Sequence, residues 1–215
     1  MAYKKLLYPL LDEVEGFRRK VYNDSRKIPT VGYGFNLNAP DTAGILKLHG
    51  HDVNALRRGK RGMNPRDAQL IRDAILDKHE QLLRHTIGDD LFNGLSHNKK
   101  AGLMSMMYNS PKLIGPKMIQ GLATNDNDLA LLQEVVLSSN KKKDPGTLYR
   151  RMREAELMSP DNFQNAFKAM EPNSLHELKT VAKDHPEIQK RYGSLLSLEP
   201  EKPTGILNKI IDYFK

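Results

Sequence analysis

Apolar residues recur at helical spacing along most of the chain. Over residues 3–15 they lie on one face of a helix that Gly16 is placed to end, and Pro9 fits this helix only if it begins close before the proline. The same spacing predicts a long helix over residues 64–86, with Asn64 as its N-cap. Shorter helices are predicted over residues 97–108, 112–122, 126–138 and 147–158, and another begins at Ser159-Pro160.

One stretch alternates instead of following the helical period. Val31, Tyr33, Phe35 and Leu37 are separated by small or polar residues, which predicts a strand with one apolar face over residues 30–37. Turn-forming residues precede it, so a hairpin or a three-stranded sheet is expected there. Since no other stretch alternates in this way, we predict a mainly helical α+β fold with one small sheet near the N-terminus.

The remaining segments are predicted to form loops, a linker and a C-terminal helical extension. Residues 38–63 contain four glycines and are expected to be rich in loops. A capping box over residues 174–177 predicts a helix start. Residues 199–205 resemble a linker, and residues 206–215 carry five apolar side chains on one face of a terminal amphipathic helix.

Charge and composition narrow the class of protein. The 215 residues carry a net charge of +8. Residues 1–158 hold 26 Lys/Arg against 18 Asp/Glu, whereas residues 159–215 hold eight of each. A basic body suggests a polyanionic partner: a nucleic acid, an anionic membrane or an acidic cell-wall polymer. The lack of cysteine excludes disulfides and thiol catalysis, and neither a membrane-spanning run nor a signal peptide is expected.

Two carboxylates are candidates for chemistry. Glu15 continues the apolar face of the first predicted helix at its negative end, so partial burial and the helix dipole are expected to raise its pKa, as a general acid requires. Asp24 lies in the turn before the strand, where Thr30 is placed to hold a water between the two. Carboxylates of unlike environment perform glycoside hydrolysis. The simpler alternatives are a solvated glutamate at a helix end and an aspartate that only forms a turn.

The residues around these carboxylates resemble a known signature. Residues 15–24 (EGFRRKVYND) and 29–34 (PTVGYG) resemble the opening motif of the phage-type (T4-like) lysozymes, glycoside hydrolase family 24. Weaker blocks follow in the family's order. Residues 62–85 resemble its interlobe helix, residues 101–109 its buried central helix, and residues 146–157 its closing motif Gly-Leu-x-x-Arg-Arg-x-x-Glu-x-x-Leu.

The resemblance implies a two-lobed fold and a domain organisation. It covers about residues 3–158, so residues 1–158 are expected to form the catalytic domain, with a β-containing lobe over about 15–60 and a helical lobe over 61–158. Residues 159–215 lie outside it and are expected to form two or three helices, with additional helices over 159–198. These either pack on the catalytic domain or serve in targeting.

The resemblance also implies an activity and a set of site residues. It implies a muramidase that cleaves the β-1,4 bond between N-acetylmuramic acid and N-acetylglucosamine in peptidoglycan, with inversion. Glu15 would be the general acid, and Asp24 and Thr30 would hold the attacking water. The expected substrate-binding residues are Tyr22, Gly34, Phe35, Tyr108 and Asn109. No cofactor and no metal are expected.

Three features depart from the family pattern. Phe35 occupies the position of a frequent histidine, so any salt bridge made by that histidine is missing. Lys27 occupies the position of a usual glycine, which puts the shape of that turn in question. The chain also has no tryptophan. None of these departures touches Glu15, Asp24 or Thr30.

Other readings of the chain stay open at this point. A basic helical nucleic-acid-binding protein and a virion structural protein with a lysozyme-like fold are the alternatives. His49 and His51 lack a third ligand, which argues against zinc.

A monomer is expected. It would be made in the host cytoplasm and would act on the wall in the periplasm, as a released endolysin or a virion-borne enzyme. Membrane contact by residues 206–215 is less favoured than packing or docking.

Overall fold

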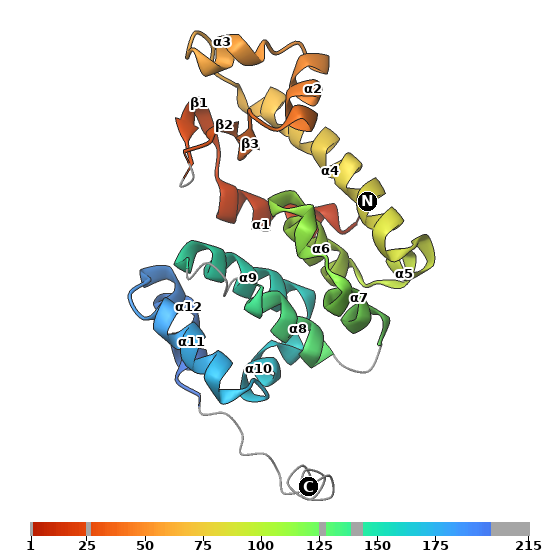
Figure 1. Cartoon of the computed structure of the whole chain (residues 1–215), viewed down its shortest axis with the longest axis vertical. Coiled ribbons are helices and arrows are strands. Elements are labelled where there is room, and N and C mark those ends of the chain that lie inside the picture. The colour runs from red at the N-terminus through yellow and green to blue at the C-terminus, as the bar shows by residue number, and fades with distance from the viewer. Residues whose placement is uncertain (1, 25–26, 125–127, 139–143, 199–215) are drawn as a thin grey trace, which may run out of the picture. The chain divides into compact units, whose positions relative to one another are not determined.

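The computed structural model describes residues 2–24, 27–124, 128–138 and 144–198. The chain is mainly helical with one three-stranded antiparallel sheet (Figure 1), which confirms the predicted α+β class. It divides into two compact units, residues 1–114 and 115–215. The domain boundaries expected at residues 60 and 158 stay predictions. The linker and helix predicted over residues 199–215 lie outside the described residues.

The first unit contains the sheet and the longest helix. Its elements are α1 (Lys4–Glu15), β1 (Arg18–Asn23), β2 (Pro29–Gly32), β3 (Phe35–Asn36), α2 (Pro40–Leu48), α3 (Val53–Arg57), α4 (Pro65–Ile87), α5 (Asp89–Gly94), α6 (His97–Asn109) and the 3-10 turn η1 (Pro111–Leu113). Helix α4 runs from the region of α2 and α3 to α5 (Figure 1).

Helix α1 forms as predicted, although Pro9 occupies its sixth position rather than its first turn. A proline there removes one helical hydrogen bond, to the carbonyl of Lys5. Pro9 is exposed, so water can solvate that carbonyl instead. The apolar side chains Leu7, Leu10 and Leu11 are buried on the opposite face. Gly16 ends the helix at a φ of +63° and donates its N–H to the carbonyl of Asp12.

The single strand predicted over residues 30–37 is wrong, because the chain reverses within it. Val31 pairs with Phe35 and Thr30 with Asn36, so residues 32–34 form a tight turn between β2 and β3. Gly32 and Gly34 adopt φ values of +67° and +81°, which favour glycine. Strand β1 pairs with β2, which confirms the expected three-stranded sheet.

The alternation nevertheless identified the apolar face of this region correctly. Val31, Phe35 and Leu37 are all at most 2% exposed. They join one apolar cluster with side chains from α2, α3, α4 and the segment before α4, namely Leu46, Leu56, Met63, Ala68, Ile71 and Ile75. This cluster fixes the sheet against α4.

Two helices occur where loops were expected, over residues 38–63. Helix α2 starts at Pro40, whose fixed φ suits a first helical position, and it tolerates Gly44 in its interior. Helix α3 is capped by Asp52, whose carboxylate accepts the backbone N–H groups of Asn54 and Ala55. The glycines at 50 and 59 end these short helices, so they marked helix ends rather than continuous loop.

Helix α6 is the buried centre of the first unit. Residues 101–107 are all buried, including three methionines, and the helix packs against both α1 and α4. This burial agrees with the central helix that the family resemblance implied. The end of α6 brings Tyr108 and Asn109 toward the sheet.

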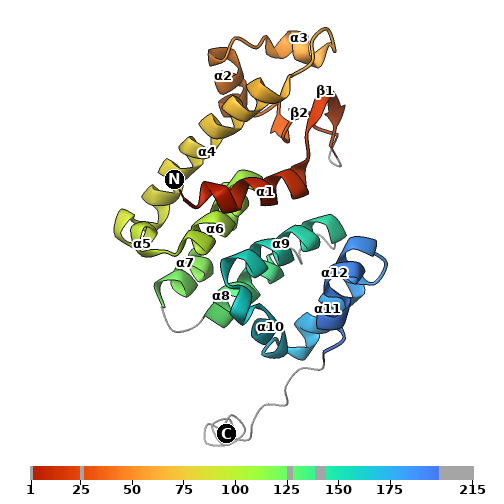
Figure 2. The same cartoon turned by 180° about the vertical axis from the view of Figure 1, so that it is seen from behind.

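The second unit is entirely helical in its described part. It contains α7 (Pro116–Ala123), α8 (Asp128–Leu137), α9 (Pro145–Met158), α10 (Pro160–Lys168), α11 (Pro172–Ala182) and α12 (Pro186–Leu196), seen from behind in Figure 2. On α9, Arg150 and Arg151 both pair with the buried Glu154. The closing family motif therefore forms a buried ion cluster within one helix. Removing one partner of such a cluster would leave a buried charge unpaired and destabilise the folded state.

The helices of residues 159–198 pack on α8 and α9, which precede them in the second unit. The Tyr192 ring of α12 lies edge-on to Phe163 and tilted against Tyr149, with ring centroids 5.7 and 6.3 Å apart. Its hydroxyl donates to Glu156 of α9 at 2.7 Å. These contacts hold α12 against α9 and α10. No described helix is both long and apolar enough to cross a membrane.

Several helices begin at a proline and not at the residue that the sequence pattern predicted. Helix α7 begins at Pro116 rather than at residue 112, because η1 occupies residues 111–113. Helix α9 begins at Pro145, directly after its cap Asp144, rather than at residue 147. The capping box over residues 174–177 is wrong, since Pro172 starts α11 and places Ser174 inside its first turn.

The turn between β1 and β2 leads to the first prediction. Lys27 adopts a φ of +61°, where a side chain is strained, and it is exposed. We expect Lys27→Gly to raise the free energy of unfolding by about 0.5–1 kcal/mol, after the entropy cost of glycine. Urea unfolding followed by circular dichroism measures this. Lys20→Gly, in the extended strand β1, is the control and should destabilise; a loss of stability in both variants would contradict the account.

Candidate active site

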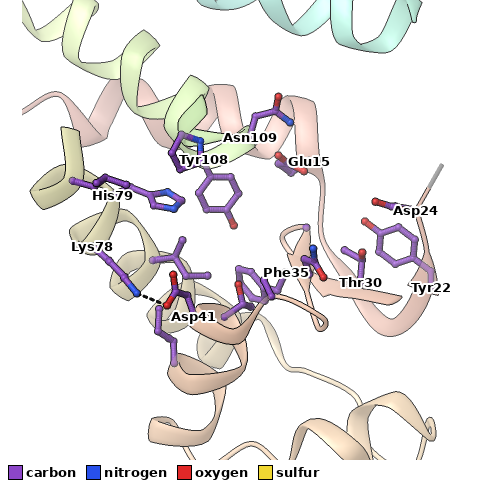
Figure 3. Close-up of a pocket in the computed structure, with 18 residues that line it drawn as sticks. Glu15, Tyr22, Asp24, Thr30, Phe35, Asp41, Lys78, His79, Tyr108 and Asn109 are labelled. Carbon is purple, nitrogen blue, oxygen red and sulfur yellow. Dashed lines mark ion pairs between the residues drawn. The ribbon is translucent and has the colours of Figure 1, made fainter. Parts of the chain in front are cut away.

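A pocket of about 400 Å³ opens in the first unit between the sheet, α2, α4 and the ends of α1 and α6. All eight residues predicted for the site line it: Glu15, Tyr22, Asp24, Thr30, Gly34, Phe35, Tyr108 and Asn109. Figure 3 shows Glu15 in the middle, with Asp24, Tyr22 and Thr30 toward one end. The structure therefore brings together residues from positions 15 to 109.

Glu15 reaches the pocket because α1 ends there. It is the last residue of α1, and Gly16 turns the chain away toward β1. The backbone of Gly34 lies against its carboxylate so closely that a Cβ atom on Gly34 would lie 2.6 Å from Glu15 Oε2. Gly34 thus forms part of the wall that fixes the half-buried carboxylate, and only glycine leaves room for it.

Asp24 and Thr30 are joined through the backbone of Ile28. Asp24 Oδ1 accepts the N–H of Ile28 at 2.8 Å, and the Thr30 hydroxyl donates to the carbonyl of Ile28 at 3.0 Å. The Asp24 backbone also pairs with Ile28 across the turn. Both side chains are therefore held in fixed orientations at one end of the pocket. Because the Thr30 proton is used, its oxygen faces other groups as an acceptor.

The pKa of the Tyr22 phenol is shifted by the charged groups around it. Burial raises the pKa of the Tyr22 phenol, and the nearby Glu15 and Asp24 carboxylates raise it further, while Arg18 opposes them. Arg18 lies over the Tyr22 ring, 4.4 Å from its centroid. The phenol therefore stays protonated near neutral pH and can act as a hydrogen-bond donor at the Asp24 end of the pocket (Figure 3).

The remaining predicted residues differ in how far they face the pocket. Tyr108 is half-buried, and its hydroxyl donates to the carbonyl of Tyr33 at 2.7 Å. Asn109 is exposed at the end of α6. Phe35 is only 2% exposed and belongs to the apolar cluster. Where the family frequently has a histidine, this chain thus has a core side chain at the edge of the pocket.

Sequence reasoning missed the other end of the pocket, which α2 and α4 form. Asp41 pairs with Lys78 there at 2.6 Å, beside His79 (Figure 3). Burial lowers the pKa of His79, as does Lys78. Its Nδ1 is buried without a hydrogen-bond partner among the described residues. Its ring lies edge-on to Tyr108, 6.3 Å between centroids. Since residues 38–63 read as loop, no sequence pattern connected Asp41 with Lys78.

Histidine and carboxylate groups do not assemble into a metal site in the part of the chain that the structure describes. His51 Nε2 lies 3.5 Å from Asp67 Oδ2. The acidic side chains that line the pocket are Glu15, Asp24 and Asp41, and the first two lie beside hydrogen-bonding neighbours. Such a set can protonate one oxygen and deprotonate another.

Comparison with known proteins agrees with this geometry. The family described as Phage lysozyme matches residues 12–154, which is well over half of the chain. The match includes Glu15, Asp24, Thr30 and the central helix α6. No curated protein sequence matches the chain.

The contact between Gly34 and Glu15 leads to the second prediction. Gly34→Ala should push the carboxylate out of place and lower kcat for peptidoglycan at least tenfold, because small misplacements of reacting groups are costly. Gly50→Ala is the matched control, since Gly50 has a similar φ of +77° but no atom within 4 Å of the added Cβ. Release of reducing sugar measures kcat. Equal kcat in the two variants would show that Gly34 does not position Glu15.

Proposed function

Since this chain belongs to the phage lysozyme family and is a peptidoglycan-hydrolysing lysozyme, we propose that it is a muramidase. It would cleave the β-1,4 bond between N-acetylmuramic acid and N-acetylglucosamine by acid–base catalysis with inversion. The observation that carries this proposal is that Glu15, Asp24 and Thr30 lie in one pocket, as the family resemblance requires.

Glu15 is proposed as the general acid. Its carboxyl group lies in the middle of the pocket, where a glycosidic oxygen would lie, and the Gly34 backbone restricts its movement. It would give its proton to the leaving oxygen of N-acetylglucosamine as the bond to the anomeric carbon breaks.

Asp24 and Thr30 are proposed to hold the attacking water. In the orientation found here, Thr30 donates to Ile28, so it would accept one O–H of the water. Asp24 would accept the other O–H and take that proton as the water oxygen bonds to the anomeric carbon. The product is a hemiacetal of opposite configuration. Proton exchange with solvent then returns Glu15 to its acid form and Asp24 to its carboxylate.

The rest of the pocket is proposed to bind the glycan. Tyr22 and Asn109 offer donors near the reacting centre, and Tyr108 offers a ring face. At the other end, the lowered pKa of His79 keeps its ring neutral near neutral pH, so it can donate or accept a hydrogen bond from a sugar. Glycan hydroxyl and N-acetyl groups match these partners.

The place of action follows from the substrate. We propose that the protein acts as a monomer on the cell wall, after release at host lysis or delivery by a virion. Its basic surface would favour the wall, since glycan strands carry lactyl carboxylates and acidic peptides.

The third prediction concerns the general acid. Glu15→Gln keeps the shape of the side chain but removes its acidic proton, so kcat should fall by about 10²–10⁴-fold with the fold unchanged by circular dichroism. Glu13→Gln on the same helix is the matched control, because Glu13 is exposed and does not line the pocket. If Glu15→Gln keeps more than about a tenth of wild-type kcat, a loss too small for a general acid, the assignment is wrong.

The fourth prediction concerns a basic surface formed by β1 and the segment after α3. Arg18, Arg19 and Lys20 are exposed, as are Arg58, Lys60 and Arg61, and the Arg19 carbonyl accepts the N–H of Met63 at 2.8 Å. The two basic segments therefore lie side by side. We expect hydrolysis of whole peptidoglycan to fall as salt rises, because salt screens this attraction over about 8–10 Å.

Charge reversal tests the source of that effect. Arg58→Glu with Arg61→Glu should flatten the salt dependence, whereas Lys183→Glu with Lys190→Glu changes net charge equally in the segment without surplus charge and should retain it. Identical salt profiles would refute the role of the basic surface. A DNA mobility-shift assay on the wild type tests the nucleic-acid alternative, and tight binding there would favour that alternative.

A further inference from the structure

We propose that Arg72 is a positioning residue for Glu15, although it does not line the pocket. The inference rests on the proposed function, because it concerns how the general acid is held. Arg72 is a charged side chain in the first half of α4, yet only 3% of it is exposed. Burying a guanidinium destabilises the folded state unless the charge is paired. The contacts of Arg72 therefore indicate which parts of the fold it holds in place.

The first contact of Arg72 is with the last turn of α1. Its Nη1 donates to Asp12 Oδ1 at 2.5 Å. Asp12 lies three residues before Glu15, and its carbonyl accepts the N–H of Gly16, which ends the helix. Arg72 therefore holds the turn of α1 from which the Glu15 side chain extends.

The second contact of Arg72 is with the turn between β2 and β3. Its guanidinium lies over the ring of Tyr33, 4.2 Å from the centroid, and over Tyr8 at 4.6 Å. The carbonyl of Tyr33 is also held by the Tyr108 hydroxyl. The next residue is Gly34, whose backbone lies against the Glu15 carboxylate.

One guanidinium thus connects the two walls that confine Glu15. The ion pair holds the helix that bears the carboxylate, and the stacking holds the turn that restricts it. A planar guanidinium can donate at its edge while its face stacks on an aromatic ring, whereas a lysine ammonium lacks the planar fork. The arrangement predicts that loss of Arg72 affects the chemical step rather than substrate affinity.

Kinetics of Arg72→Met test this in the full-length protein. The variant keeps an apolar side chain of similar length, and we expect kcat to fall about 10- to 100-fold with KM unchanged. Arg84→Met is the matched control on the same helix. Arg84 pairs with Glu80 and Asp89 and lies over Phe92 at 4.1 Å, but it does not line the pocket and contacts neither wall of Glu15. It should lose thermal stability and retain wild-type kcat.

Two substitutions of Tyr33 keep the test decisive if Arg72→Met does not fold. Tyr33→Leu removes the ring under the guanidinium and should lower kcat. Tyr33→Phe retains the ring and should keep the wild-type kcat. A change in KM alone, or a folded Arg72→Met or Tyr33→Leu protein with wild-type kcat, would overturn the proposal. A purely structural role would lower the melting temperature of all these variants without separating them in kcat.

A readout independent of turnover separates this inference from the proposed function. The carboxyl ¹³C resonance of Glu15, assigned by its loss in Glu15→Gln, should shift in Arg72→Met and stay in place in Arg84→Met. An unchanged resonance in Arg72→Met refutes the positioning role even if the wild type proves inactive. Wild-type inactivity on peptidoglycan would instead refute the proposed function.

Discussion

Long polar side chains connect α1 to α4, and the last of these contacts, that of Arg72 with Asp12, lies one turn before Glu15. Tyr3 donates to Glu80, Lys4 pairs with Asp77, Tyr8 donates to Asp73 and Asp12 accepts from Arg72, so the contacts run in opposite chain directions on the two helices. Burial and their carboxylate partners raise the pKa of both tyrosines, which keeps the phenols as donors. Because the series ends one turn before Glu15, a slip of α1 along α4 would move the carboxylate out of the pocket.

The second requirement is a sheet whose turns place small groups where the chemistry needs space. Gly34 adopts a positive φ and leaves room for Glu15, while Asp24 and Thr30 share the backbone of Ile28. Lys27 takes a left-handed conformation in the same turn as Asp24. Lys27, at a position where the family usually has glycine, therefore adds backbone strain but leaves the hydrogen bonds of Asp24 in place. Phe35 is likewise absorbed by the apolar cluster.

The sequence predicts this arrangement unevenly, for physical reasons. Apolar periodicity was sufficient for α1, α4 and α6, whose buried faces are long, and the eight site residues predicted with the help of the family resemblance all line the pocket. Alternation over residues 30–37 predicted burial correctly but missed the reversal at Gly32–Gly34, because a tight turn preserves the alternation. Helices α2 and α3 were missed because a single proline or aspartate starts each one, and the ion pair of Arg72 with Asp12 links residues 60 positions apart. Such long-range pairs leave no local pattern.

Stereochemistry tests the central claim most directly, because a water held by Asp24 and Thr30 opposite Glu15 dictates which face of the sugar is attacked. The measurement is proton NMR of the reducing-end N-acetylmuramic acid in the first moments of peptidoglycan hydrolysis, before the anomers equilibrate. The account predicts that the α anomer forms first, by inversion of the β-1,4 linkage. Initial formation of the β anomer, or release of peptides without new reducing ends, would contradict it.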